Sequence, residues 1–216
     1  MTNRTNDSAE LSDTKRKLLD ASVTLMRTKG YNATTVDDVC TSAGVTKGAF
    51  FHYFKNKEEI AKAALARFYD RRLEDFQNAP FRKLADPLDR IFGRLDFGAE
   101  YIGGPDQLTK GCLIGMFAQE LSFTNPELRA ASFEALRKSV ADVEKDLAAA
   151  KAVHAPDADF SPRQVAQLYV SMYQGALMMA KASESNRILV ENLEQFREYL
   201  NLLFGKTAKA MAVTSC

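Results

Sequence analysis

The chain has 216 residues, of which 46% are hydrophobic and 26% are charged, and its net charge is +1. These values are ordinary for a soluble globular protein with a sizeable core, and they exclude a global excess of basic charge while leaving room for a local basic patch. Three widely separated cysteines without a CxxC pair, and only two histidines, argue against a structural zinc site, so we expect no metal and no cofactor.

The N-terminal segment lacks the apolar region of a signal peptide, and the longest apolar stretches, such as residues 112–118, are too short to span a bilayer. The odd number of cysteines fits a reducing compartment. We therefore expect a cytoplasmic protein without a membrane partner.

Residues 1–12 are rich in Thr, Asn, Ser and Asp, which predicts a disordered arm. Apolar positions then follow helical spacing, and Gly30 ends the first helix as a C-cap. Thr35 is expected to cap a second, short helix that ends at Gly44, and Thr46 a third over residues 47–54. Asn56 caps a longer helix over about 57–78.

Pro80 and Pro87 interrupt the helical pattern. Further helices are expected over about 88–101, 108–121, 126–153, 162–183 and 189–206, and no window alternates clearly enough to be a strand. We therefore predict an all-α protein with about nine helices. Residues 13–60 would form a three-helix helix-turn-helix domain, and residues 61–210 a larger helical domain.

Residues 34–54 read as helix, tight glycine turn and helix, which is the helix-turn-helix pattern in which the second helix enters the major groove of DNA. Between residues 44 and 57 the chain carries Lys47, Lys55 and Lys57 but no acidic residue. Such corners are also common in helical proteins that do not bind DNA. The pattern alone therefore leaves a DNA-binding protein and a helical scaffold as alternatives.

The stretch 17–60 resembles the DNA-binding domain of the TetR family of repressors. Three segments carry the resemblance: Gly30, Tyr31, Thr34 and Thr35; the turn from Ala43 to Gly48; and the pair Phe54 and Lys57. The resemblance implies DNA contacts by Thr35, Thr46, Lys47, Gly48, Ala49, Phe51, His52, Tyr53 and Lys57. The family often has tyrosine at the position of Phe51, which here lacks the phosphate-binding hydroxyl but can touch a thymine methyl.

The resemblance also implies a C-terminal domain that binds a small molecule and forms a homodimer through the last two long helices, on a palindromic operator. Both helices carry broad apolar faces, which would equally fill a monomer core. Met and aromatic side chains suit an adaptable apolar pocket. The candidate pocket residues are Phe97, Tyr101, Cys112, Met116, Phe117, Met172 and Tyr173.

Residues 110–121 resemble a subgroup of the family that includes the repressor of N-ethylmaleimide reductase, in which the matching cysteine senses reactive electrophiles. Lys110 or a helix N-terminus would lower the pKa of the Cys112 thiol. The alternative is that Cys112 is a small core residue.

We find no GxSxG, GxxxxGK[ST] or HExxH motif and no clustered acid–base pair, and thus expect no enzyme activity. The function predicted is a ligand-responsive regulator, most simply a repressor, that a small inducer or an electrophile releases from DNA. The helix that begins near Lys57 would carry the motion between the two domains.

Overall fold

The computed structural model describes residues 12–102 and 111–205, and all regular structure in these ranges is helical. The elements are α1 (Asp13–Lys29), α2 (Val36–Ala43), α3 (Lys47–Tyr53), α4 (Lys57–Asn78), the 3₁₀ helix η1 (Pro80–Lys83), α5 (Pro87–Ile102), α7 (Leu113–Glu120), α8 (Pro126–His154), α9 (Pro162–Ser183) and α10 (Arg187–Leu203). The all-α prediction is confirmed, with nine α-helices in the described part of the chain.

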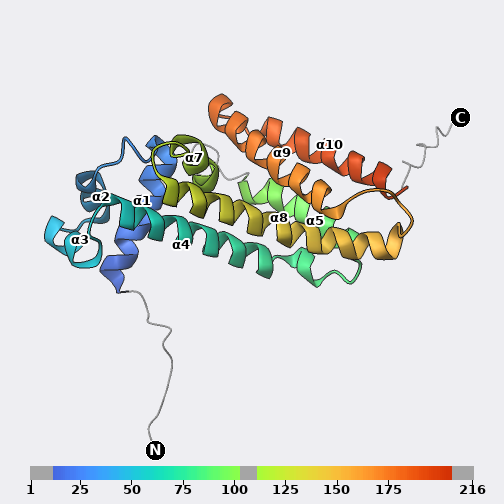
Figure 1. The fold of residues 1–216 in the computed structure, drawn as a ribbon, viewed down its shortest axis with the longest axis horizontal. Helices are drawn as coiled ribbons and strands as arrows, with labels where there is room; N and C mark the ends of the chain where they lie inside the picture. The colour runs from blue at the N-terminus through green and yellow to red at the C-terminus, as the bar shows by residue number, and fades with distance from the viewer. Residues whose placement is uncertain (1–11, 103–110, 206–216) are drawn as a thin grey trace, which may run out of the picture.

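Helices α1 to α3 form a small unit at one end of the molecule, and the first turns of α4 complete it (Figure 1). Its core holds Leu18 and Leu19 from α1, Val39 from α2, Phe50 from α3 and Ile60 from α4. Burial of these apolar side chains stabilises helices that are too short to be stable alone.

Side-chain caps fix where the short helices begin. The Oγ1 atoms of Thr35 and Thr46 accept hydrogen bonds from the backbone N–H groups three residues later, and the Asn56 side chain does the same at α4. These three predicted caps are confirmed. Helix α1 begins earlier than its apolar pattern indicates, because Ser12 caps it ahead of Asp13.

The larger part of the molecule is built from α5, α7, α8, α9 and α10, with α4 running along one side of α8 (Figure 1). Its core includes Leu95 from α5, Phe117 from α7, Leu147 from α8, Tyr173 from α9 and Leu200 from α10. Apolar side chains at helical spacing therefore position a second, larger core beside the small N-terminal one. No described helix is both long and apolar enough to cross a membrane.

The helix expected over residues 108–121 differs from the structure in its start. Residues 108–110 lie outside the described residues, as do residues 1–11 of the arm predicted over residues 1–12, whose last residue, Ser12, is the N-cap of α1. Gly111 has a positive φ of 64° and Cys112 is extended, so α7 begins only at Leu113. The Arg27 Nε donates a hydrogen bond to the Gly111 carbonyl over 2.9 Å, which holds this non-helical backbone against α1.

Candidate functional site

The α2–turn–α3 unit has helix-turn-helix geometry. Gly44 adopts the left-handed conformation with φ 66° and ends α2, a backbone state that glycine reaches without steric cost. The Val45 N–H then bonds to the Cys40 carbonyl over 3.0 Å, which closes the turn. The buried Phe50 ring anchors α3, so the opposite side of this helix faces outward.

Seven of the residues expected to contact DNA belong to α3 or to its N-cap Thr46, whereas Thr35 caps α2 and Lys57 begins α4. Thr35, Thr46, Lys47, Gly48, Phe51 and His52 are exposed, whereas Ala49, Tyr53 and Lys57 are half-buried. Phe51 is 56% exposed, so its ring is accessible to a partner outside the protein. A Cβ at Gly48 would meet the Thr46 Oγ1 at an ordinary contact distance of 3.8 Å, and the exposed glycine itself lets the start of α3 approach another molecule closely.

An acidic residue that the local charge count missed lies beside Lys47. The Asp37 Oδ1 from α2 is 2.7 Å from the Lys47 Nζ, and this hydrogen bond raises the pKa of the Lys47 ammonium group. Both side chains are 63% exposed. Lys47 must therefore exchange Asp37 for a phosphate or a base when it contacts DNA.

Two other predicted contacts also have partners within the protein. The Tyr53 hydroxyl accepts a hydrogen bond from the Ser12 hydroxyl over 2.9 Å. The Lys57 Nζ donates to the Tyr31 carbonyl over 3.1 Å and lies 4.2 Å from the centroid of the Tyr31 ring. Lys57 thereby ties α4 to the turn between α1 and α2, a role that the sequence pattern did not indicate.

The predicted ligand residues do not share one cavity. Tyr173 lines a cavity of about 60 Å³ to which α4, α5, α7, α8 and α9 contribute, whereas Cys112 lines two other hollows, one with Tyr101 and the other with Met116. Phe117 is buried against the Tyr31 ring, and Met172 packs against the core. Phe97 belongs to an aromatic cluster with Phe76, Phe81 and Tyr101.

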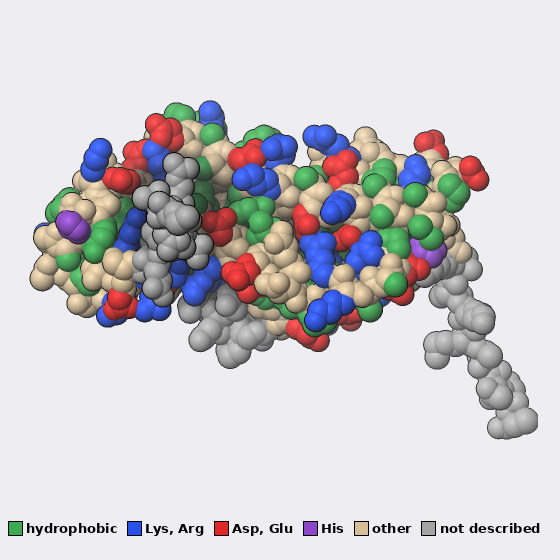
Figure 2. Space-filling view, turned by 90° about the horizontal axis from the view of Figure 1, so that it is seen from below, with side chains coloured by type: hydrophobic (Ala, Val, Ile, Leu, Met, Phe, Trp, Pro, Cys, Tyr) green, Lys and Arg blue, Asp and Glu red, His purple; other side chains and the backbone are tan. Residues whose placement is uncertain are grey.

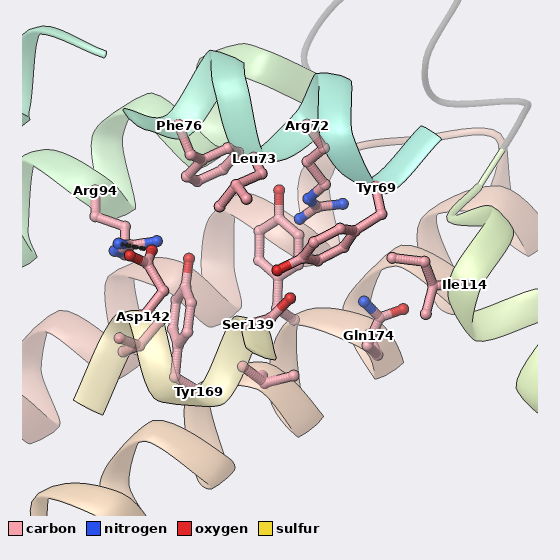
Figure 3. Close-up of a pocket in the computed structure, with 13 residues that line it drawn as sticks. Tyr69, Arg72, Leu73, Phe76, Arg94, Ile114, Ser139, Asp142, Tyr169 and Gln174 are labelled. Carbon is pink, nitrogen blue, oxygen red and sulfur yellow. Dashed lines mark hydrogen bonds and ion pairs between the residues drawn. The ribbon is translucent and has the colours of Figure 1, made fainter. Parts of the chain in front are cut away.

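The cavity that Tyr173 lines also has residues that the sequence analysis did not single out (Figure 3). Arg72 and Tyr69 reach it from α4, Tyr169 from α9, and Arg94 and Asp142 form an ion pair at one wall. These residues lie within helices whose apolar side chains recur at helical spacing. The sequence pattern alone therefore could not distinguish them from ordinary surface or core residues.

Cys112 is 5% exposed and precedes α7. The Arg72 Nη1 lies 4.0 Å and the Gln174 Nε2 3.6 Å from its Sγ. A guanidinium and an amide N–H beside the sulfur are the kind of surroundings in which reactive cysteines occur, while its burial fits a core residue. Lys110, which was expected to influence this thiol, lies outside the described residues.

Glu120 joins the two parts of the molecule. Its Oε2 accepts a hydrogen bond from the Tyr31 N–H over 2.8 Å, and its Oε1 accepts one from the Asn32 N–H over 2.7 Å. Nearby, the Lys181 Nζ donates to the Arg27 carbonyl over 2.7 Å. The turn that precedes α2 is therefore held directly by the last residue of α7.

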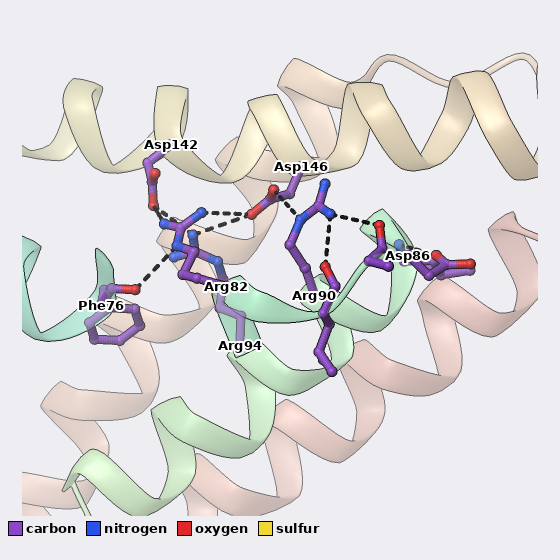
Figure 4. A network of polar contacts seen from close by, with 10 residues as sticks. Phe76, Arg82, Asp86, Arg90, Arg94, Asp142 and Asp146 are labelled. Atoms are coloured by element: carbon purple, nitrogen blue, oxygen red, sulfur yellow. Dashed lines mark hydrogen bonds and ion pairs between the residues drawn. The ribbon is translucent and has the colours of Figure 1, made fainter. Parts of the chain in front are cut away.

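A cluster of charged side chains joins η1, α5 and α8 (Figure 4). Asp142 accepts from Arg82 over 2.5 Å and from Arg94 over 2.6 Å, and Asp146 pairs with Arg82 and Arg90. Burial opposes ionisation of Asp142, but the two guanidinium groups outweigh it and hold the pKa of this carboxyl below its usual range. Elsewhere basic and acidic side chains are interspersed, and the face seen in Figure 2 has no large area of one sign.

These features define a class: a helix-turn-helix protein that presents α3 at one end and carries a separate helical domain behind it. Residues 18–64 match the family model "Bacterial regulatory proteins, tetR family", and residues 87–196 match "Tetracyclin repressor-like, C-terminal domain". The chain belongs to the TetR family of bacterial transcriptional regulators.

Individual relatives agree with this assignment. The chain is 29% identical to the transcriptional regulator AcuR of Cereibacter sphaeroides, over 77% of this chain and 75% of that protein. It is 26% identical to the transcriptional repressor DhaR of a Mycobacterium species, over 84% and 87% of the two chains. The crystal structure of reduced NemR from Escherichia coli is 25% identical and superposes with a TM-score of 0.76, covering 86% of this chain and 96% of that one. AcuR and DhaR are regulators of transcription.

Proposed function

We propose that the protein is a dimeric repressor that reads a palindromic operator with α3 and leaves it when a small molecule binds the C-terminal domain. The observation that carries this proposal is the outer surface of α3, where Phe51 and Lys47 are exposed beside the exposed Gly48, which has no side chain. The start of this helix can therefore enter the major groove of DNA. Because bacterial operators are located in the cytoplasm, the proposal places the protein there.

A homodimer through α9 and α10 is supported by apolar side chains left uncovered on these helices. Leu168 and Met179 of α9 are each 48% exposed, and Leu202 of α10 is 73% exposed. The same helices bury Tyr169, Tyr173, Leu193 and Leu200 in the core, so the two alternative roles of their apolar faces are compatible. A second copy packed on the exposed side would place two α3 helices on one DNA duplex.

The proposed release step needs a route from the C-terminal domain to α3. The predicted route through α4 is supported by Lys57, which contacts the turn before α2. Glu120 offers a second and shorter route, because it binds the same turn from α7. A ligand that favours a different position of α7 or α4 would thereby shift the orientation of α3.

Two kinds of inducer fit the region behind α7. One is a small molecule held in the cavity that Tyr173 lines, and the other is an electrophile that reacts with Cys112. The contacts of Arg72 and Gln174 with the sulfur favour the second, and the burial of Cys112 restricts it to small reagents.

The experiment that tests the repressor proposal is selection of bound duplexes from a random DNA library at near-physiological salt. The expected result is an inverted repeat with half-sites about one helical turn, or roughly 10 base pairs, apart. Recovery of no common sequence by folded protein would overturn the proposal. With the operator in hand, Cys112→Ser tests the electrophile route, since it should abolish release by N-ethylmaleimide only if Cys112 is the sensor.

A further inference from the structure

We propose that the cavity lined by Arg72, Tyr69 and Tyr169 binds a small organic carboxylate, with the guanidinium group of Arg72 as its counter-charge. The inference rests on the proposed function, because it names the class of inducer that this regulator would take. It follows from the charges, donors and dimensions of the cavity.

Arg72 differs from the other arginines around it. Arg67 and Arg71 on the same helix bind Asp20, and Arg82, Arg90 and Arg94 bind Asp142 or Asp146. In the described residues Arg72 has no carboxylate within ion-pair distance. Its guanidinium carbon lies 5.4 Å from the Phe76 ring centroid and 5.2 Å from that of Tyr173.

A partly buried guanidinium without a counter-charge is energetically unfavourable, and its planar fork matches a carboxylate in a bidentate arrangement. Aromatic faces offset part of this cost. The Nη1 donor is directed at the Cys112 Sγ, 4.0 Å away, and within the described residues the Nε and Nη2 donors have no hydrogen-bond partner. An anionic ligand would supply the missing charge.

Hydroxyl groups from two sides of the cavity add donors for the second carboxylate oxygen. Within residues 12–102 and 111–205, neither Tyr69 nor Tyr169 has a hydrogen-bond partner for its hydroxyl. Figure 3 shows Tyr69 and Arg72 extending from α4, and Tyr169 from α9, towards the same space. Burial raises the pKa of the Tyr169 phenol, which therefore stays protonated at neutral pH and donates.

The one carboxylate in the cavity wall does not repel an anion strongly, because Asp142 is already bound by Arg82 and Arg94. Ile114, Val143 and Val170 provide apolar walls opposite the polar groups. The cavity volume of about 60 Å³ has room for about four to six water-sized groups. These dimensions match a carboxylate with a short aliphatic chain: acetate, propionate or butyrate.

The test is calorimetric titration of the full-length protein, free of DNA, with sodium acetate, propionate and butyrate at constant ionic strength set with chloride. We expect saturable binding of at least one carboxylate and none of propionamide, which has the same shape but no charge. Arg72→Gln should weaken binding by at least about 10-fold. Arg71→Gln, one residue away but exposed and paired with Asp20, should bind as the wild type does.

Tyr169→Phe is a second variant that keeps the volume of the core and removes one donor, with an expected loss of about 5-fold. The inference would be overturned by any of three results: equal binding of propionate and propionamide, no binding of any of the three carboxylates, or unchanged carboxylate affinity in folded Arg72→Gln. Operator binding, measured separately, distinguishes the two proposals. If the wild-type protein binds its operator but no carboxylate, only the proposed ligand is contradicted. If it binds a carboxylate but recognises no operator, the proposed repressor function is contradicted.

Discussion

The ion pair between Asp37 and Lys47 controls, at the scale of single residues, how much positive charge α3 offers to DNA. Both side chains are largely exposed, so water and salt screen their attraction, and a phosphate can compete with Asp37 for the Lys47 ammonium. The pairing nevertheless keeps Lys47 close to the start of α3, where a groove would meet it.

Opposite effects on operator affinity are expected from removing the two partners. Lys47→Ala should weaken binding and reduce the slope of log affinity against log salt by about 1 for each subunit. Asp37→Asn should strengthen binding, because it frees Lys47 and removes a negative charge near DNA. Fluorescence anisotropy with a labelled operator over a range of salt concentrations measures both. A Lys47→Ala protein with unchanged affinity and slope would show that this lysine does not contact DNA.

Residue types and caps allowed much of this surface to be predicted. Thr35, Thr46 and Asn56 marked the helix starts because their side chains bond the free N–H groups of the next turn. The partners of Lys47 and Lys57 could not be predicted, since Asp37 and Tyr31 approach them only after three helices have packed. The DNA contacts themselves stay predictions.

At the scale of helices, Glu120 at the end of α7 connects the turn before α2 with the C-terminal domain. The Glu120 carboxylate accepts hydrogen bonds from two backbone N–H groups there, one at each oxygen. A neutral amide cannot reproduce this arrangement, because its nitrogen is a donor. The connection is independent of α4, which was the only route that the sequence suggested.

Glu120→Gln should loosen this turn and lower the free energy of unfolding by about 1 kcal/mol, since one hydrogen bond is lost and a donor faces a donor. Operator affinity should fall with it, because α3 is held less firmly relative to the rest of the molecule. Denaturant unfolding and operator titration measure the two effects. Glu127→Gln, which changes an exposed carboxylate on α8, should alter neither the free energy of unfolding nor the operator affinity. A Glu120→Gln protein in which both quantities are also unchanged would contradict the role assigned to Glu120.

The charged cluster between η1, α5 and α8 makes a pH-dependent contribution to stability. The pKa of Asp142 is lowered in the folded protein, so its contribution is fully present above the ordinary carboxyl pKa and is lost as pH falls through the lower folded value. Asp142→Asn should therefore cost about 2 kcal/mol at pH 7, less than for a fully buried pair because the side chain is partly exposed.

Urea unfolding of the wild type and of Asp142→Asn at pH 7 and near pH 3 measures this difference, which should shrink at the acidic pH. Glu134→Gln removes an exposed ion pair with Arg137 on the same helix and should have no measurable effect at either pH. A difference that grows on acidification would contradict the assigned direction of the pKa.

The whole molecule combines a small reading unit with a larger helical body, and its fold was largely predictable because helical spacing of apolar residues extends through almost all of it. The start of α7 was predicted too early, since the positive φ of Gly111 and its contact with Arg27 are set by tertiary packing. The residues of the cavity were harder still to predict. The residues proposed for it were Met and aromatic types, and of these only Tyr173 lines it, beside charged and hydroxyl groups from α4, α8 and α9.

Dimer formation through α9 and α10 should be prevented by Met179→Glu, because a charge would be buried where an exposed apolar side chain meets its symmetry mate. We expect a folded monomer in light-scattering chromatography, with operator affinity strongly reduced. Leu84→Glu changes a comparably exposed apolar residue between η1 and α5 and serves as the control. A Met179→Glu protein that remains dimeric would assign the interface to another surface.

The central claim is that two α3 helices of one dimer read two half-sites, and the most direct test is the affinity of the wild-type protein for altered operators. We would compare the selected inverted repeat with a single half-site and with a version carrying about five extra base pairs between the half-sites, a rotation of roughly half a helical turn. The intact repeat should bind at least about 100-fold tighter than either altered duplex, since the second half-site is engaged at high effective concentration. Equal affinity for all three duplexes would contradict the account.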